Sequence, residues 1–192
     1  MPGADPVMDR HRARPNINFM MIETINKALF QITKYVAWLG MAFLLGAMFI
    51  TSTDVVLRKV DSAGIYGTID LIQLMIISAA YLAIPHAFMN RSHVAVSIAA
   101  DLFSRRGLAL CNLIAAILAC VFMIAIAWNG YSQARTQYQY GDISITLGLP
   151  MIYYWVPLLF GAGLSALVTL HMAIESIYTI ITGRGALTPE LE

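Results

Sequence analysis

Charged residues are scarce in this sequence. Asp, Glu, Lys and Arg make up 12% of the 192 residues and hydrophobic residues 59%, whereas an ordinary soluble domain has about 25% charged and about 45–50% apolar residues. A water-facing exterior is therefore not expected. The net charge of +1 gives neither a basic field that could hold nucleic acid nor an acidic tail, so nucleic-acid binding is set aside.

Motifs of enzymes and metal sites are also missing. The sequence has no glycine-rich phosphate loop and no paired-cysteine metal spacing, and no serine or cysteine is placed with an identifiable base. The two cysteines, Cys111 and Cys120, are too far apart along one helix to form a disulfide, and are interpreted as buried apolar side chains. We therefore expect no catalysis, no cofactor and no bound metal.

Long uncharged runs are what the sequence does contain. Four of them lie between charged residues, and each is long enough for the about 20 mostly apolar residues with which a helix crosses ~30 Å of hydrocarbon. The first run is too long for a cleavable signal peptide and should stay as an anchor. The spans are predicted near 35–56, 70–90, 107–129 and 150–175. The fold class is therefore all-α, an integral membrane four-helix bundle.

Positive residues orient this bundle, because Lys and Arg close to a span resist translocation. One side has nine of them, which are Arg10, Arg12, Arg14, Lys27, Lys34, Arg91, Arg105, Arg106 and Arg184. The other side has three, Arg58, Lys59 and Arg135. With an even number of spans, both termini are expected in the cytoplasm.

The segments outside the spans differ in character. Residues 1–21 are expected to be a flexible cytoplasmic tail and residues 182–192 a second cytoplasmic tail, on either side of a membrane domain over 22–181. Apolar residues at steps of three and four over 22–34 predict an amphipathic helix that leads into the first span. A second amphipathic stretch, 94–105, is expected to lie flat on the inner membrane surface, with a plain cytoplasmic loop as the alternative.

Two kinds of residue on the spans indicate how the helices pack and bend. Rows at steps of four, a pattern that lets helix backbones approach closely but also arises by chance, run through Ala42, Gly46 and Ile50 and through Gly161, Ser165 and Thr169. Pro85 and Pro157 fall inside spans, where each removes a backbone hydrogen bond and bends the helix, while Pro150 suits the first turn of the last span.

No Asp, Glu, Lys or Arg lies in the middle of a predicted span. A protein that itself couples a substrate to protons or sodium usually has an intramembrane ionisable group or a broken helix, and this chain is too short for paired inverted repeats of such helices. The chain is therefore interpreted as part of a carrier. A stand-alone four-helix drug exporter would need a carboxylate in the first span, and residues 35–53 contain none.

Two histidines leave one alternative open. His86 and His171 fall near the inner ends of the second and fourth spans, where histidines on facing helices could ligate a haem. The chain would then be the membrane anchor of a redox enzyme, which a haem absorbance band would reveal. A histidine near the interface more often hydrogen-bonds a neighbouring helix or water.

An ordered set of motifs resembles a known family. The set consists of Arg58, Tyr66-Gly67-Thr68-Ile69-Asp70, and the runs 81–87, 91–96, 145–150 and 154–157. In this order, and with four spans, it resembles the small membrane subunit of tripartite ATP-independent periplasmic (TRAP) transporters over residues 35–175. The sequence departs from that family at Asp70, where a glutamate is common, and at Ser97, where an acidic residue often follows the histidine motif.

The resemblance implies a location in a bacterial inner membrane and a division of labour between subunits. In such transporters a periplasmic binding protein captures an organic acid, a large membrane subunit moves it with a sodium gradient, and the small subunit braces the large one. The partners implied for this chain are therefore a large TRAP permease subunit, a periplasmic substrate-binding protein and membrane lipids. The identity of the substrate would be encoded in the other subunits.

Seven residues are candidates for partner contacts or structural roles: Arg58, Asp70, Arg91, His93, Gly148, Pro150 and Pro157. We expect Arg58 and Asp70 to bind or orient groups at the outer surface. Arg91 and His93 are expected to hold the amphipathic segment or the partner subunit at the inner surface. The alternative for these four is that they are ordinary interfacial charges.

Overall fold

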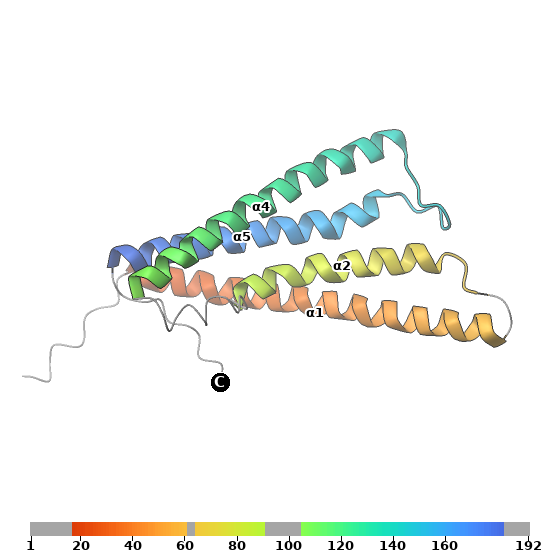
Figure 1. Cartoon of the computed structure of the whole chain (residues 1–192), viewed down its shortest axis with the longest axis horizontal. Helices are drawn as coiled ribbons and strands as arrows, with labels where there is room; N and C mark the ends of the chain where they lie inside the picture. The colour runs from red at the N-terminus through yellow and green to blue at the C-terminus, as the bar shows by residue number, and fades with distance from the viewer. Residues whose placement is uncertain (1–16, 61–63, 91–104, 183–192) are drawn as a thin grey trace, which may run out of the picture.

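The structure, a computed structural model of the whole chain, describes residues 17–60, 64–90 and 105–182. Its helices are α1 (Ile17–Val60), α2 (Thr68–Met89), α4 (Arg105–Tyr140) and α5 (Ile152–Thr182), shown in Figure 1. All four are long and apolar enough to cross a membrane. The predicted all-α class with four membrane helices is therefore confirmed.

Two of the helices, α1 and α4, extend at least ten residues beyond the predicted spans at one end. α1 begins at Ile17, within the segment expected to be a flexible tail, and includes the amphipathic stretch 22–34 without a break. α4 continues past residue 129 and ends at Tyr140. Neither helix contains a proline. A helix satisfies its own backbone hydrogen bonds, which favours continuing it wherever no residue interrupts it.

The helices lie side by side in the order α1, α2, α5, α4. This order follows from the pairs in extensive contact, which are α1 with α2, α2 with α5, and α5 with α4. Figure 1 shows that they lie closest together at one end and spread apart toward the other. We call the spread end, where residues 64–67 and 141–151 lie, the loop end. The opposite end, where α1 begins and α5 ends, is the terminal end.

Small residues bring neighbouring helices into contact. A Cβ atom at Gly40 would lie 3.0 Å from the carbonyl oxygen of Ala79 on α2, and one at Gly161 would overlap the carbonyl of Tyr81. Ser165 and Thr169 continue the row of Gly161 along α5, and both are fully buried. The close approach predicted for this row is therefore found, but between helices of this chain.

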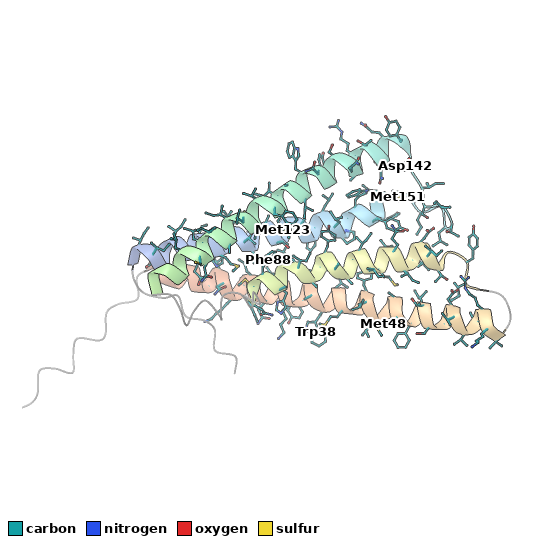
Figure 2. All side chains as sticks on the ribbon, in the orientation of Figure 1. Trp38, Met48, Phe88, Met123, Asp142 and Met151 are labelled. Atoms are coloured by element: carbon teal, nitrogen blue, oxygen red, sulfur yellow. The ribbon has the colours of Figure 1, made fainter. Side chains whose placement is uncertain are left out.

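Large apolar side chains cover the outside of the four-helix arrangement. Trp38 and Met48 of α1 are 62% and 59% exposed, and Figure 2 shows both on the side of α1 away from α2. Met123 of α4 is by contrast buried, on the side that faces α5. Surrounding hydrocarbon is as apolar as these side chains, so their exposure is compatible with the chain's four membrane helices.

Candidate functional site at the loop end

Asp54 holds together the connection between α1 and α2. Its Oδ2 atom accepts a hydrogen bond from Arg58 Nε at 2.8 Å, one turn further along α1. Its Oδ1 atom accepts the backbone N–H of Ile65 at 2.7 Å and lies 3.1 Å from the Thr68 hydroxyl. Asp54 is buried and Thr68 is buried beside it. One carboxylate thus ties the last turns of α1 to the first turn of α2.

Asp70 makes the corresponding link between α2 and the loop that precedes α5. Its Oδ2 atom accepts the backbone N–H groups of Thr146 at 3.0 Å and Leu147 at 2.8 Å. The Tyr154 hydroxyl donates to the Asp70 backbone carbonyl at 3.1 Å. Asp70 lies in the first turn of α2, where a negative charge also offsets the positive end of the helix dipole. This residue therefore anchors a loop distant in sequence.

Gly67 allows this loop to approach α2 so closely. It has a φ of +79° immediately before the helix, and a Cβ atom there would overlap the side chain of Leu147. Both the left-handed backbone and the contact require the absence of a side chain. The glycine is thus placed where the α1–α2 connection meets the α4–α5 connection.

The α4–α5 connection is ordered by its own hydrogen bonds. Ser144 N–H donates to the Leu149 carbonyl at 2.8 Å, and the Leu149 N–H donates to the Ser144 hydroxyl at 3.1 Å. Gly148 turns the chain with a φ of +65° in open space. Pro150 follows, and its carbonyl accepts the Tyr153 N–H at 3.2 Å as α5 begins. The loop that Asp70 holds is therefore a compact turn.

A side-chain bond also joins α4 to α5 near the loop end. The indole N–H of Trp155 donates to Gln137 Oε1 at 2.6 Å. Since Asp54 links α1 to α2 and Asp70 links α2 to the loop before α5, each neighbouring pair in the row has a polar connection at this end.

The arrangement favours holding loops over chemistry. Both buried carboxylates are already hydrogen-bonded to groups of this chain, and the part of the chain that the structure describes has no group of three or more His, Cys, Asp or Glu that could hold a metal. A pocket of about 280 Å³ lies among Arg58, residues 64–69 and Thr146. Among the described residues that line it, Arg58 is the one with a charged side chain, and it is paired with Asp54.

The predicted site residues are only partly brought together. Asp70, Gly148 and Pro150 belong to one cluster at the loop end, and Arg58 lies beside Asp54 in the neighbouring connection. Pro157 lies apart, inside α5. Arg91, His93 and most of the predicted interfacial segment 94–105 fall outside the described residues.

Sequence reasoning missed Asp54, Thr68 and Tyr154. Asp54 was used only to mark the end of a span, although an aspartate four residues before an arginine is a recognisable helical ion-pair spacing. Thr68 and Tyr154 have no comparable local signal, because their partners lie 14 and 84 positions away in the sequence.

One of the two histidines considered for haem contacts α1. His86 Nδ1 lies 3.4 Å from the Thr33 hydroxyl, and its ring is tilted against Phe30 with centroids 5.5 Å apart. This environment matches the ordinary expectation that such a histidine hydrogen-bonds a neighbouring helix.

Comparison with known protein families finds a match that covers more than half of this chain. The model of one protein family, described as tripartite ATP-independent periplasmic transporters, DctQ component, matches residues 47–179. The match includes the loop end, the last part of α1, and all or nearly all of α2, α4 and α5. Comparisons with curated proteins and with solved structures gave no match.

Proposed function

We propose that this chain, which belongs to the DctQ component family of tripartite ATP-independent periplasmic transporters, braces the large permease subunit. The family makes it the small permease component of such a transporter. In this proposal the large subunit carries out sodium-coupled uptake of an organic acid, which a periplasmic binding protein delivers. The proposed role of this chain is to hold that subunit in the membrane.

The observation that carries this proposal is that the buried carboxylates are hydrogen-bonded within the chain. A carrier needs groups that can bind and release an ion or a substrate. Asp54 and Asp70 instead bind backbone N–H groups of their own chain. Glu175, which is buried near the terminal end, also has an interaction partner. Fixed internal bonds of this kind support a rigid structural part.

The orientation that we propose follows the positive residues. The terminal end faces the cytoplasm, and the loop end with Asp54 and Asp70 faces the periplasm, in a bacterial inner membrane. Arg58 and Asp70 then stabilise the periplasmic connections. Arg91 and His93 are proposed, as before, to contact the amphipathic segment or the large subunit on the cytoplasmic side.

Reconstitution tests the proposal. Liposomes with an inward sodium gradient would contain this chain alone, the large subunit alone, or both, each with the soluble binding protein and its labelled organic acid. Uptake is expected only with both membrane subunits, and the two should co-purify in mild detergent. Sodium-driven uptake by this chain alone, or full uptake by the large subunit alone, would refute the bracing role.

A further inference from the structure

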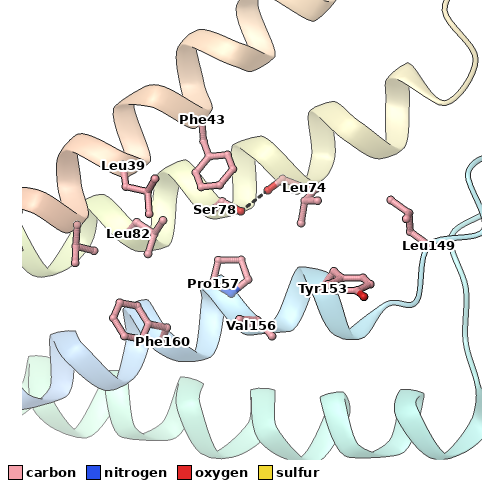
Figure 3. A pocket seen from close by; sticks show the side chains of 11 residues that line it. Leu39, Phe43, Leu74, Ser78, Leu82, Leu149, Tyr153, Val156, Pro157 and Phe160 are labelled. Carbon is pink, nitrogen blue, oxygen red and sulfur yellow. Dashed lines mark hydrogen bonds between the residues drawn. The ribbon is translucent and has the colours of Figure 1, made fainter.

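An apolar groove runs along one side of α2, between α1 and α5. Its volume is about 500 Å³. Figure 3 shows Leu39 and Phe43 of α1 on one side and Val156 and Pro157 of α5 on the other. The residues that line it are Val36, Leu39, Phe43, Leu74, Ser78, Leu82, Leu149, Tyr153, Val156, Pro157 and Phe160.

The groove is limited by a helix contact at one end and by a loop at the other. Toward the terminal end, Gly161 brings α5 onto the Tyr81 carbonyl of α2. Toward the loop end, the groove reaches Leu149, which belongs to the compact turn that Asp70 holds. Between these points it lies wholly on membrane-crossing helices, so it opens sideways into the hydrocarbon of a bilayer.

The lining offers an occupant almost no polar contact. Ser78 is its one polar side chain away from the loop end, and its hydroxyl donates to the Leu74 carbonyl at 2.7 Å, as the dashed line in Figure 3 shows. The other polar side chain, Tyr153, is 56% exposed and lies near the loop end. The occupant must therefore be apolar over most of its length.

The groove is about as long as one leaflet is thick. The eight residue steps from Leu74 to Leu82 on its floor rise about 12 Å at 1.5 Å per residue. Half of the ~30 Å hydrocarbon layer is about 15 Å. The groove thus has about the length of one leaflet's hydrocarbon, and it runs from Tyr153 near the loop end to the middle of the helices.

The side chains of the lining argue against a helix as the occupant. Membrane helices pack closely on small residues, but here the small residues that permit close approach, Gly40 and Gly161, are already in contact with α2. The lining consists mostly of bulky aliphatic and aromatic side chains around an irregular space. A flexible hydrocarbon chain can follow the shape of such a space. Filling the space is favoured, because atoms that line an empty space lose van der Waals contacts.

We propose that the groove binds one acyl chain of a bilayer phospholipid from the leaflet at the loop end. The chain lies against Leu74, Ser78 and Leu82, with its ester end near Tyr153. This inference depends on the embedding of the helices in a membrane, and it is independent of the bracing role.

Photolabelling of the full chain tests the site. The probe is a phospholipid with a diazirine in one acyl chain, present as a small fraction of phosphatidylethanolamine and phosphatidylglycerol vesicles, and adducts are mapped by mass spectrometry. Phe160 in the groove and Phe122 on α4 are 55% and 61% exposed, and Val156 and Val121 are 58% and 60% exposed. We expect severalfold more adducts at Phe160 and Val156 than at their α4 counterparts.

Equal labelling within these pairs would overturn the proposal, because it would mean that lipid only follows exposed area. A matched pair of variants gives a second measurement. Val156→Trp should lower the labelling of Phe160 severalfold, whereas Val121→Trp should leave it unchanged. The same labelling is repeated with the large subunit present. Loss of the Phe160 adducts there, with cross-links from a photoreactive group at position 160 to the large subunit, would assign the groove to that subunit and overturn the lipid site.

Discussion

Asp70 Oδ2 accepts the backbone N–H of Leu147 at 2.8 Å, across 77 positions of sequence. The bond joins the first turn of α2 to the turn that precedes α5. It adds a polar connection at the loop end to the close packing of α5 on α2 at Gly161. It also explains how a row of helices that spreads apart toward the loop end keeps its connections in place there.

Removal of the Asp70 carboxylate is the most direct test of this connection. Asp70→Ala leaves the part-buried N–H groups of Thr146 and Leu147 without their acceptor, and donors that lose their partner away from water are costly. The melting temperature of the purified chain in detergent should fall by several degrees, and less for Asp70→Asn, whose amide oxygen can still accept. Asp142→Ala, an exposed carboxylate of the same loop, is the control and should change the melting temperature little. Equal melting temperatures for all three variants would contradict the anchoring role.

Asp54 and Arg58 form one ion pair but should not contribute equally. Arg58 is 59% exposed on its side chain, and exposed pairs contribute about 0–1 kcal/mol. Asp54 also holds Ile65 and Thr68, so Asp54→Ala should lower the melting temperature clearly more than Arg58→Ala. A double-mutant cycle measures the coupling of the pair, with Lys59→Ala as the control for loss of a neighbouring positive charge. The prediction is wrong if Arg58→Ala proves the more damaging change.

Alanine variants of Gly67 and Gly148 should distinguish the cost of backbone strain from the cost of steric overlap. Both have a positive φ, but a Cβ atom overlaps Leu147 only at Gly67, whereas Gly148 faces open space. Gly148→Ala should therefore lower the free energy of unfolding by the left-handed penalty of about 1–2 kcal/mol. Gly67→Ala should lower it further, because the loop must also move. The free energy of unfolding is measured in micelles that mix a mild detergent with a denaturing one. Equal losses for the two variants would show that Leu147 moves aside at no cost.

The proposed orientation predicts the outcome of reporter fusions. Fusions after residue 192 and within 91–106 should read cytoplasmic, and fusions near 61–66 and 136–142 should read periplasmic, because nine of twelve positive residues lie on the first side. An enzyme active only in the periplasm and a fluorescent protein that matures only in the cytoplasm give opposite readouts at each site. A reversed pair of readouts would reject the proposed orientation.

The sequence predicted the helices well because their signal is local. A charge such as Asp54 or Asp70 marks the end of an uncharged run without any knowledge of the fold, although α1 itself continues past Asp54 to Val60. The contact of Gly161 shows the limit of this reasoning. Its spacing correctly indicated close packing, but nothing in the spacing told whether the packed helix belonged to this chain or to another.

The order of the helices was beyond the sequence for a related reason. In water a polar face identifies the outside of a helix, whereas in hydrocarbon both faces can be apolar. The N–H groups that Asp70 binds are also invisible in sequence, since every residue except proline has one. An acidic residue at a helix start predicts a helix cap more readily than a bond to a loop 76 positions away.

The row of helices also has a consequence for biosynthesis. α1 with α2 and α4 with α5 are two helical hairpins, each made of helices that follow one another in the chain. The ribosome finishes the first hairpin before it starts the second, so the contact of α2 with α5 forms only after α5 has entered the membrane. The bonds from Asp70 to Thr146 and Leu147 therefore close late in synthesis, when both hairpins are present.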